Sequence, residues 1–120
     1  MQTRSQRYAA QIFAQVSRVG EEERKKYGSL AHRLPVLIRS AGLAQALAFV
    51  RAKGGPAGER LLADLAAAVG QADLERRSRC ADLLEYMRLT RDVLAALVWY
   101  KRFAQSVLGV EPGADEGDEE

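Results

Sequence analysis

The chain has 120 residues, of which 48% are hydrophobic and 28% charged, a balance typical of one globular domain with its own core. Its one cysteine, Cys80, cannot form an internal disulfide, which excludes a secreted disulfide scaffold. No apolar run reaches the roughly 18 residues of a membrane span and no signal-peptide pattern follows Met1, so we expect a cytoplasmic protein.

The charge is distributed unevenly along the chain. Residues 111–120 contain six acidic residues and no basic one, so residues 1–110 keep 18 basic against 10 acidic residues, a formal charge of +8. A basic body of this kind suits a polyanionic partner. Gly109, Pro112 and Gly113 lead into the acids, and we expect disorder from Gly109 onward. We therefore divide the chain into a helical domain, residues 1–110, and a disordered acidic tail, residues 111–120.

Apolar residues recur at α-helical spacing through the first half of the chain. Thr3 and Gln6 fit a capping box, so we expect a first helix from there to Gly20. Its buried face should consist of Tyr8, Ile12, Phe13, Val16 and Val19. A second helix contains Pro35, where we expect a kink or a restart, and Gly42 should join it closely to a third helix.

The second half of the chain continues the helical pattern. Pro56 is placed to begin a fourth helix that stops at Gly70, and residues 71–79 should be irregular or a short helical turn. A fifth helix is predicted to bury Cys80, Leu83, Leu84 and Met87. Thr90 should cap a last helix, which is apolar almost all round and should therefore be central. The predicted fold is all-α: a single compact bundle of five or six helices with short loops.

The residues offer little for catalysis or metal binding. His32 has no His or Cys three or four positions away, so we interpret it as a surface or partly buried side chain rather than a metal ligand. Cys80 should be a buried thiol rather than a nucleophile. Asp82 and Glu85 form an i, i+3 pair, but no Glu-x-x-His motif accompanies them. We expect no enzymatic activity, no metal and no cofactor.

Two stretches contain an ordered set of short motifs: residues 27–49, YGSLAHRLPVLIRSAGLAQALAF, and residues 89–108, LTRDVLAALVWYKRFAQSVL. The motifs are Leu34-Pro35, Leu37-Ile38-Arg39, Gly42-Leu43, Leu47-Ala48-Phe49, Thr90-Arg91, Trp99 and Lys101-Arg102-Phe103. Together they resemble the small α-helical subunit of the type III-B CRISPR effector, the Cmr complex, over residues 3–108. Ser40-Ala41 departs from the Thr-Asn that the family more often has there.

The resemblance implies a non-catalytic subunit of an RNA-guided antiviral ribonucleoprotein. In that family the small subunits stack into a minor filament beside a repeated backbone subunit and line the channel that holds guide RNA and target RNA. The implied partners are the backbone subunit, other subunits of the complex, neighbouring copies of the chain and both RNAs. At matching positions it implies RNA contact by Arg39, Lys101 and Arg102, with Arg33 and Lys53 as secondary candidates.

Several alternatives stay open. Trp99, Tyr100 and Phe103 could stack on bases, although aromatic residues on a central helix usually belong to the core. Trp99 is offset from the main apolar face, so we expect it to be half-exposed and suited to anchoring a protein contact. The acidic tail is either inert or a competitor of RNA for the basic body.

The chain could also be a protein–protein adaptor that contacts no nucleic acid. The RNA-binding function and the adaptor function differ in one feature of the structure, which is whether the basic residues converge on one face.

Overall fold

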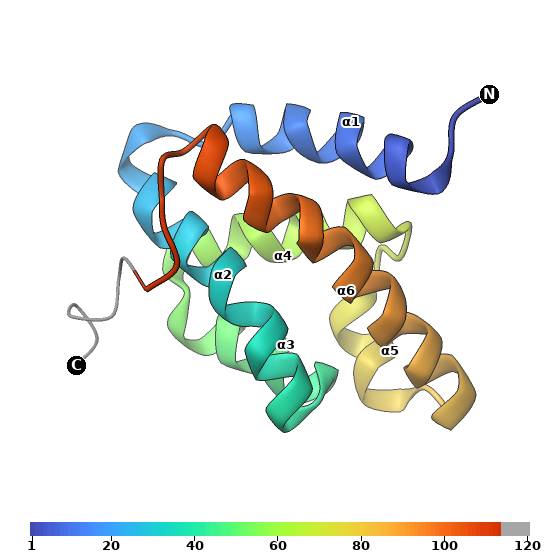
Figure 1. The fold of residues 1–120 in the computed structure, drawn as a ribbon. Coiled ribbons are helices and arrows are strands. Elements are labelled where there is room, and N and C mark those ends of the chain that lie inside the picture. Colours follow the sequence, from blue (N-terminus) through green and yellow to red (C-terminus); the bar gives the residue numbers. More distant parts are fainter. Residues whose placement is uncertain (114–120) are drawn as a thin grey trace.

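A computed structural model describes residues 1–113 of the chain and contains no strand in that range. The elements are α1 (Arg4–Ser17), the 3-10 turn η1 (Glu21–Glu23), α2 (Arg24–Ala41), α3 (Leu43–Lys53), α4 (Gly55–Val69), α5 (Leu74–Cys80) and α6 (Leu83–Ser106). In Figure 1, α6 crosses the molecule diagonally, and it packs against α1, α2, α4 and α5. The predicted all-α bundle with a central last helix is confirmed.

The first helix begins as predicted but uses one apolar residue differently. Thr3 and Gln6 form both hydrogen bonds of the capping box. Ile12 and Val16 are fully buried, whereas Phe13 is 51% exposed, so its assignment to the buried face was wrong. One residue turns an α-helix by about 100°, which carries Phe13 away from the row of Ile12 and Val16. Its ring instead packs edge-on against Phe103 of α6, with 5.4 Å between centroids.

The joint between α2 and α3 depends on Gly42. Its φ is +92°, a conformation that side chains disfavour, and the hydroxyl of Tyr86 lies 3.0 Å from where a Cβ would be. The same hydroxyl accepts a hydrogen bond from the backbone N–H of Ala44, at 3.1 Å, and so satisfies a donor in the first turn of α3. Of the kink or restart expected at Pro35, the restart does not occur, because α2 is continuous through this residue, which is itself buried. The kink stays a prediction.

The boundary between the last two helices differs from the prediction. Ala81 has extended backbone angles, φ −69° and ψ 149°, and separates α5 from α6. Asp82 caps α6 by accepting a hydrogen bond from the N–H of Glu85, at 3.0 Å, so Thr90 lies inside the helix rather than at its start. Helical spacing does not hold across this break. For that reason the expected buried face is exposed, at Cys80, Leu83, Leu84 and Met87.

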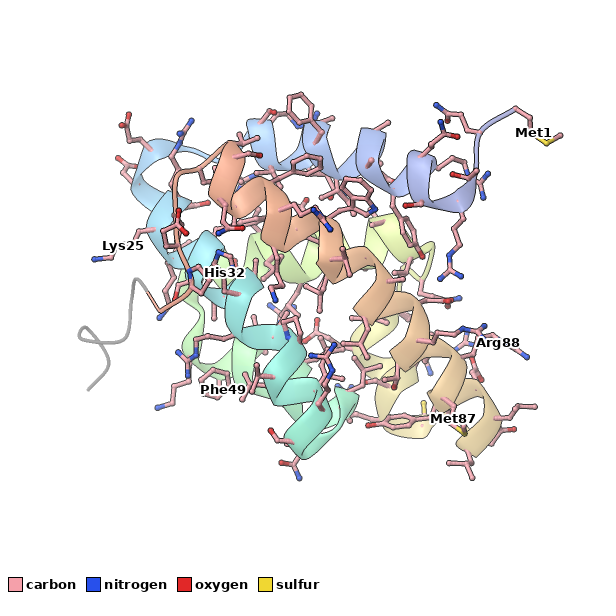
Figure 2. The ribbon with its side chains drawn as sticks, viewed as in Figure 1. Met1, Lys25, His32, Phe49, Met87 and Arg88 are labelled. Atoms are coloured by element: carbon pink, nitrogen blue, oxygen red, sulfur yellow. The ribbon has the colours of Figure 1, made fainter. Side chains whose placement is uncertain are left out.

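The chain beyond α6 is ordered further than expected. Val110 is buried, and its N–H donates a 2.8 Å hydrogen bond to the carbonyl of Ala104. The Nε2–H of His32 on α2 donates to the Val110 carbonyl, also at 2.8 Å (Figure 2). The expectation of disorder at Gly109 and Val110 was therefore wrong. Of the acidic tail, residues 114–120 lie outside the described range, and their disorder stays a prediction.

These contacts give the direction of α6 relative to α2. Val110, just beyond the end of α6, packs on Gly28 near the start of α2, and Tyr86, near the start of α6, contacts the end of α2 at Gly42. The two helices therefore run antiparallel. We call the segment from Leu108 to Val110 the strap, because it closes this helix pair at one end.

A network of polar groups crosses the core between four helices. Tyr100 donates its hydroxyl hydrogen to the side-chain oxygen of Gln15, whose amide nitrogen donates to the backbone carbonyl of Asp64 at 3.0 Å. Tyr27 donates to the Asp64 carboxylate at 2.7 Å. Burial raises the pKa of both tyrosines, so both remain protonated donors. A network whose members are satisfied in this way fixes the relative positions of α1, α2, α4 and α6.

Replacing Gly28 with alanine tests the strap. The new Cβ would lie 2.7 Å from Cβ of Val110, so we expect the strap to be displaced and the free energy of unfolding to fall by roughly 1–3 kcal/mol. Urea unfolding and amide exchange at Val110 measure both effects. Gly20→Ala is the matched control, because no atom lies within 4 Å of its Cβ position. Equal stability of the two variants would contradict the packing of Val110 on Gly28.

Asp64 should make stability depend on pH. Burial raises its pKa, against the opposing effects of the Tyr27 hydrogen bond and the charges of Arg60 and Arg18. The folded protein therefore binds this proton more tightly than the unfolded chain, so stability falls as the pH rises from the ordinary aspartate pKa, about 3.9, through the higher folded value.

We expect Asp64→Asn to lose this part of the pH dependence, because asparagine does not titrate while its amide oxygen can still accept from Tyr27. Urea unfolding between about pH 3 and pH 7 measures it. Glu59→Gln, an exposed position on the same helix, serves as the control and should keep the wild-type dependence. The assignment to Asp64 fails if the free energy of unfolding of Asp64→Asn and of the wild type changes equally with pH.

Candidate nucleic-acid interface

The last turns of α6 present two of the predicted RNA contacts. Lys101 is half-buried and Arg102 is exposed. Consecutive residues point about 100° apart on a helix, so the two cations lie on adjoining sides rather than in one spot. The Arg102 guanidinium carbon lies 5.9 Å from the ring centroid of Trp99, within the range of a cation–π contact.

The remaining predicted contacts are on α2 and α3. Arg39 is exposed in the last turn of α2, where a cation is favoured by the helix dipole. Arg33 is half-buried, with its guanidinium carbon 5.3 Å from the ring centroid of Phe49 on α3 (Figure 2). Lys53 is exposed at the end of α3. Arg33 therefore lies toward α3, and six residues further on Arg39 points to another side of α2.

The five predicted cations do not converge on one point. Because α2 and α6 are antiparallel, Arg39 lies near the start of α6 and Lys101 and Arg102 lie near its end. Arg33 and Lys53 belong to the α2–α3 side. The arrangement is an extended distribution of positive charge, which suits a long polyanion better than a compact one.

Ion pairs separate the basic residues into two groups. Several arginines are paired with carboxylates: Arg4 with Asp92, Arg51 with Glu75, Arg60 with Glu23, Arg76 with Asp73 and Arg77 with Glu85. Within residues 1–113, no ion pair involves Arg39, Lys53, Lys101 or Arg102. These four predicted contacts thus keep charges that no described carboxylate neutralises, as a surface for phosphates requires.

Trp99 is half-buried, as expected from its offset position. Its ring stacks on Phe103, with 5.6 Å between centroids and 29° between planes. Its indole N–H donates to the Ser5 hydroxyl at 3.2 Å. Whether it anchors a protein contact stays a prediction.

The seam between α1 and α6 contains a hollow of about 250 Å³ that sequence reasoning missed. It is lined by Arg4, Ser5, Tyr8, Ala95 and Trp99. The residues come from two helices that are far apart in the chain, so helical periodicity could not bring them together. The one available signal was the offset of Trp99 from the apolar face of its helix.

His32 and Cys80, which were considered as a metal ligand and a nucleophile, belong to no cluster of metal ligands within residues 1–113. His32 is buried and bonded to the strap, so the expectation of a surface or partly buried side chain was wrong. Cys80 is exposed, which corrects the expected buried thiol. In residues 1–113 no three His, Cys, Asp or Glu side chains come together as metal ligands. No helix in that range combines the length and apolarity needed to cross a membrane.

Comparisons with known proteins agree on one family. Residues 4–107 match the family model described as CRISPR-associated protein (Cas_Cmr5). A Thermus thermophilus protein, the CRISPR system Cmr subunit Cmr5, is 47% identical over 112 residues, covering 90% of this chain and 98% of its own length. The X-ray structure of a CRISPR-associated Cmr5 family protein from the same organism matches with a TM-score of 0.77 at 46% identity, covering 89% of this chain and 98% of that one.

An all-α chain matched in this way along most of its length is a CRISPR-associated protein. More particularly, it belongs to the Cmr5 family. The resemblance inferred from the two motif stretches is confirmed.

Proposed function

We propose that this chain is a non-catalytic small subunit of a type III-B CRISPR ribonucleoprotein, which scaffolds the minor filament and contacts guide and target RNA through charge. Family membership supports the assignment to the complex, since the Thermus relative is described as a subunit of the CRISPR Cmr system. The proposed partners are the repeated backbone subunit, other subunits, neighbouring copies of the chain, and guide and target RNA.

The observation that best supports RNA contact is a set of four cations, Arg39, Lys53, Lys101 and Arg102, that form no ion pair within residues 1–113. They extend over α2, α3 and α6 on a body whose formal charge is +8. Lysine and arginine neutralise phosphates without reading base sequence, and protein recognises an RNA duplex mainly through its backbone and shape. The proposed binding is therefore independent of sequence and weakens with salt.

We propose a non-catalytic role: within residues 1–113 no three His, Cys, Asp or Glu side chains come together as metal ligands, and the motifs of the chain match no enzyme. The single histidine is committed to the strap, where its Nε2–H is bonded to a carbonyl. In the proposed complex, cleavage of target RNA belongs to the backbone subunit.

A second candidate function, a protein–protein adaptor without nucleic-acid contact, is favoured by a different surface. Leu83, Leu84 and Met87 are 75%, 68% and 58% exposed at the start of α6. Met87 and Arg88 lie at the opposite end of the view from His32 and Phe49 in Figure 2. Adjoining exposed apolar side chains often mark a protein contact. This corner is compatible with assembly in either function, so RNA binding is what distinguishes them.

Charge reversal at Lys101 and Arg102 tests the proposal. The doubly substituted chain, Lys101→Glu with Arg102→Glu, is mixed with the backbone subunit and guide RNA, and co-elution is followed by size exclusion at several salt concentrations. We expect weaker co-elution at high salt. We also expect weaker binding of duplex RNA, with a salt slope shallower by roughly one for each phosphate that the variant no longer neutralises.

Arg76→Glu with Arg79→Glu changes the net charge equally on α5 and serves as the control. Co-elution and duplex affinity that respond equally to both double variants would show that only net charge matters. Co-elution without any RNA binding would favour the adaptor. A folded chain that associates with no subunit would contradict the proposed assembly.

A further inference from the structure

The hollow at the α1–α6 seam is lined by an aromatic side chain from each helix, Tyr8 of α1 and Trp99 of α6. Trp99 stacks on Phe103, which follows it by one helical turn. One turn before Trp99 the helix has Ala95, which also lines the hollow and whose side chain is only a methyl group. With about 250 Å³, the hollow is smaller than the roughly 300–1,000 Å³ of sites that enclose drug-sized ligands. It therefore suits a single planar ring system.

The walls of the hollow are held in place by hydrogen bonds and an ion pair. The Trp99 indole is tied to Ser5 of α1 at 3.2 Å. The Arg4 guanidinium donates to the Tyr8 hydroxyl at 3.1 Å and to the Asp92 carboxylate at 2.5 Å. A ligand that enters need not order these groups, which lowers the entropic cost of binding.

Cations lie along the same side of α6 as the hollow. Helical spacing of four, three, four and three residues places Arg88, Asp92, Ala95, Trp99 and Arg102 in one row. Arg4 neutralises the one carboxylate in this row, Asp92. Arg88 and Arg102 are exposed on either side of the hollow, and within residues 1–113 neither forms an ion pair.

We propose that this hollow binds an unpaired nucleobase of single-stranded RNA, which stacks on Trp99 while Arg88 and Arg102 neutralise the neighbouring phosphates. An aromatic ring between exposed cations is the combination that binds single strands without sequence preference. A protein side chain fits less well, because the exposed apolar corner of the chain lies elsewhere, at Leu83, Leu84 and Met87. The inference rests on the proposed function only in requiring that the chain meets RNA.

Trp99 provides a direct measurement, because it is the one tryptophan of the chain. Its fluorescence is titrated at low salt with a short single-stranded polyadenylate, with a blunt RNA duplex and with inorganic polyphosphate. Binding of each probe is followed independently by competition against a labelled single strand. We expect quenching by the single strand alone, because the duplex and polyphosphate offer charge but no base that can enter the hollow.

Four substitutions separate the effect of the hollow from that of the surrounding charge. Ala95→Leu fills the hollow and leaves Trp99 in place, and we expect it to abolish quenching and to weaken single-strand binding about tenfold, the effect of losing one stacked base. Val98→Leu places the same leucine side chain on the exposed side of α6 and should change neither. Trp99→Phe retains an aromatic ring and should bind far better than Trp99→Leu. Duplex affinity should be the same in all four variants.

Three results would overturn the inference. The first is Trp99 fluorescence that stays unchanged when the chain is saturated with single-stranded RNA. The second is equal affinity of Ala95→Leu and Val98→Leu for the single strand. The third is a folded chain that binds no single strand at all, because every residue that lines the hollow belongs to this chain and no partner is needed to complete it. A fluorescence change caused by the backbone subunit but not by RNA would assign Trp99 to a protein contact instead. Loss of duplex binding on reversal of Lys101 and Arg102 is a separate readout, so the proposed function and this inference can fail independently.

Discussion

The antiparallel packing of α2 against α6 is the constraint on which the rest of the structure depends. It is closed at both ends by contacts that require particular residues. At one end the Tyr86 hydroxyl lies against Gly42 and accepts the Ala44 N–H. At the other end Val110 occupies the space that the missing side chain of Gly28 leaves. The buried network of Tyr100, Gln15, Asp64 and Tyr27 then attaches α1 and α4 to this pair.

This packing decides where the charge of the body is presented. With α6 central, its paired carboxylates Asp92 and Glu85 face neighbouring helices, and its exposed charges are all arginines, Arg88, Arg91 and Arg102. The cations proposed to contact RNA are therefore spread along the helix pair and onto α3. Charges spread in this way suit contact with a long phosphate backbone at many points rather than at one.

Much of the fold was predictable from capping residues, glycine joints and helical spacing. The errors occurred where helical spacing was extended across the end of one helix into the next, or where a distant residue holds a segment. The capping box at Thr3 and the joint at Gly42 depend on a few neighbouring residues, and both are present as expected. The face through Cys80 and Met87 obeyed helical spacing but spanned Ala81, whose extended backbone separates two helices. Val110 lies among glycines and acids that predict disorder, yet Gly28 and His32, about eighty residues earlier, hold it.

By itself, the sequence determined the all-α class, the cap at Thr3, the joint at Gly42 and the family, because hydrophobic period, capping residues and ordered motifs are all local properties of the chain. It also supplied the candidate cations by their match to the family's positions. Only the tertiary structure decided which cations pair with carboxylates within residues 1–113, and that Phe13 and Met87 face outward. It alone brought Tyr8 of α1 beside Trp99 of α6 to form the hollow. Exposure and contact depend on neighbours that are distant in the sequence, and helical periodicity contains no information about them.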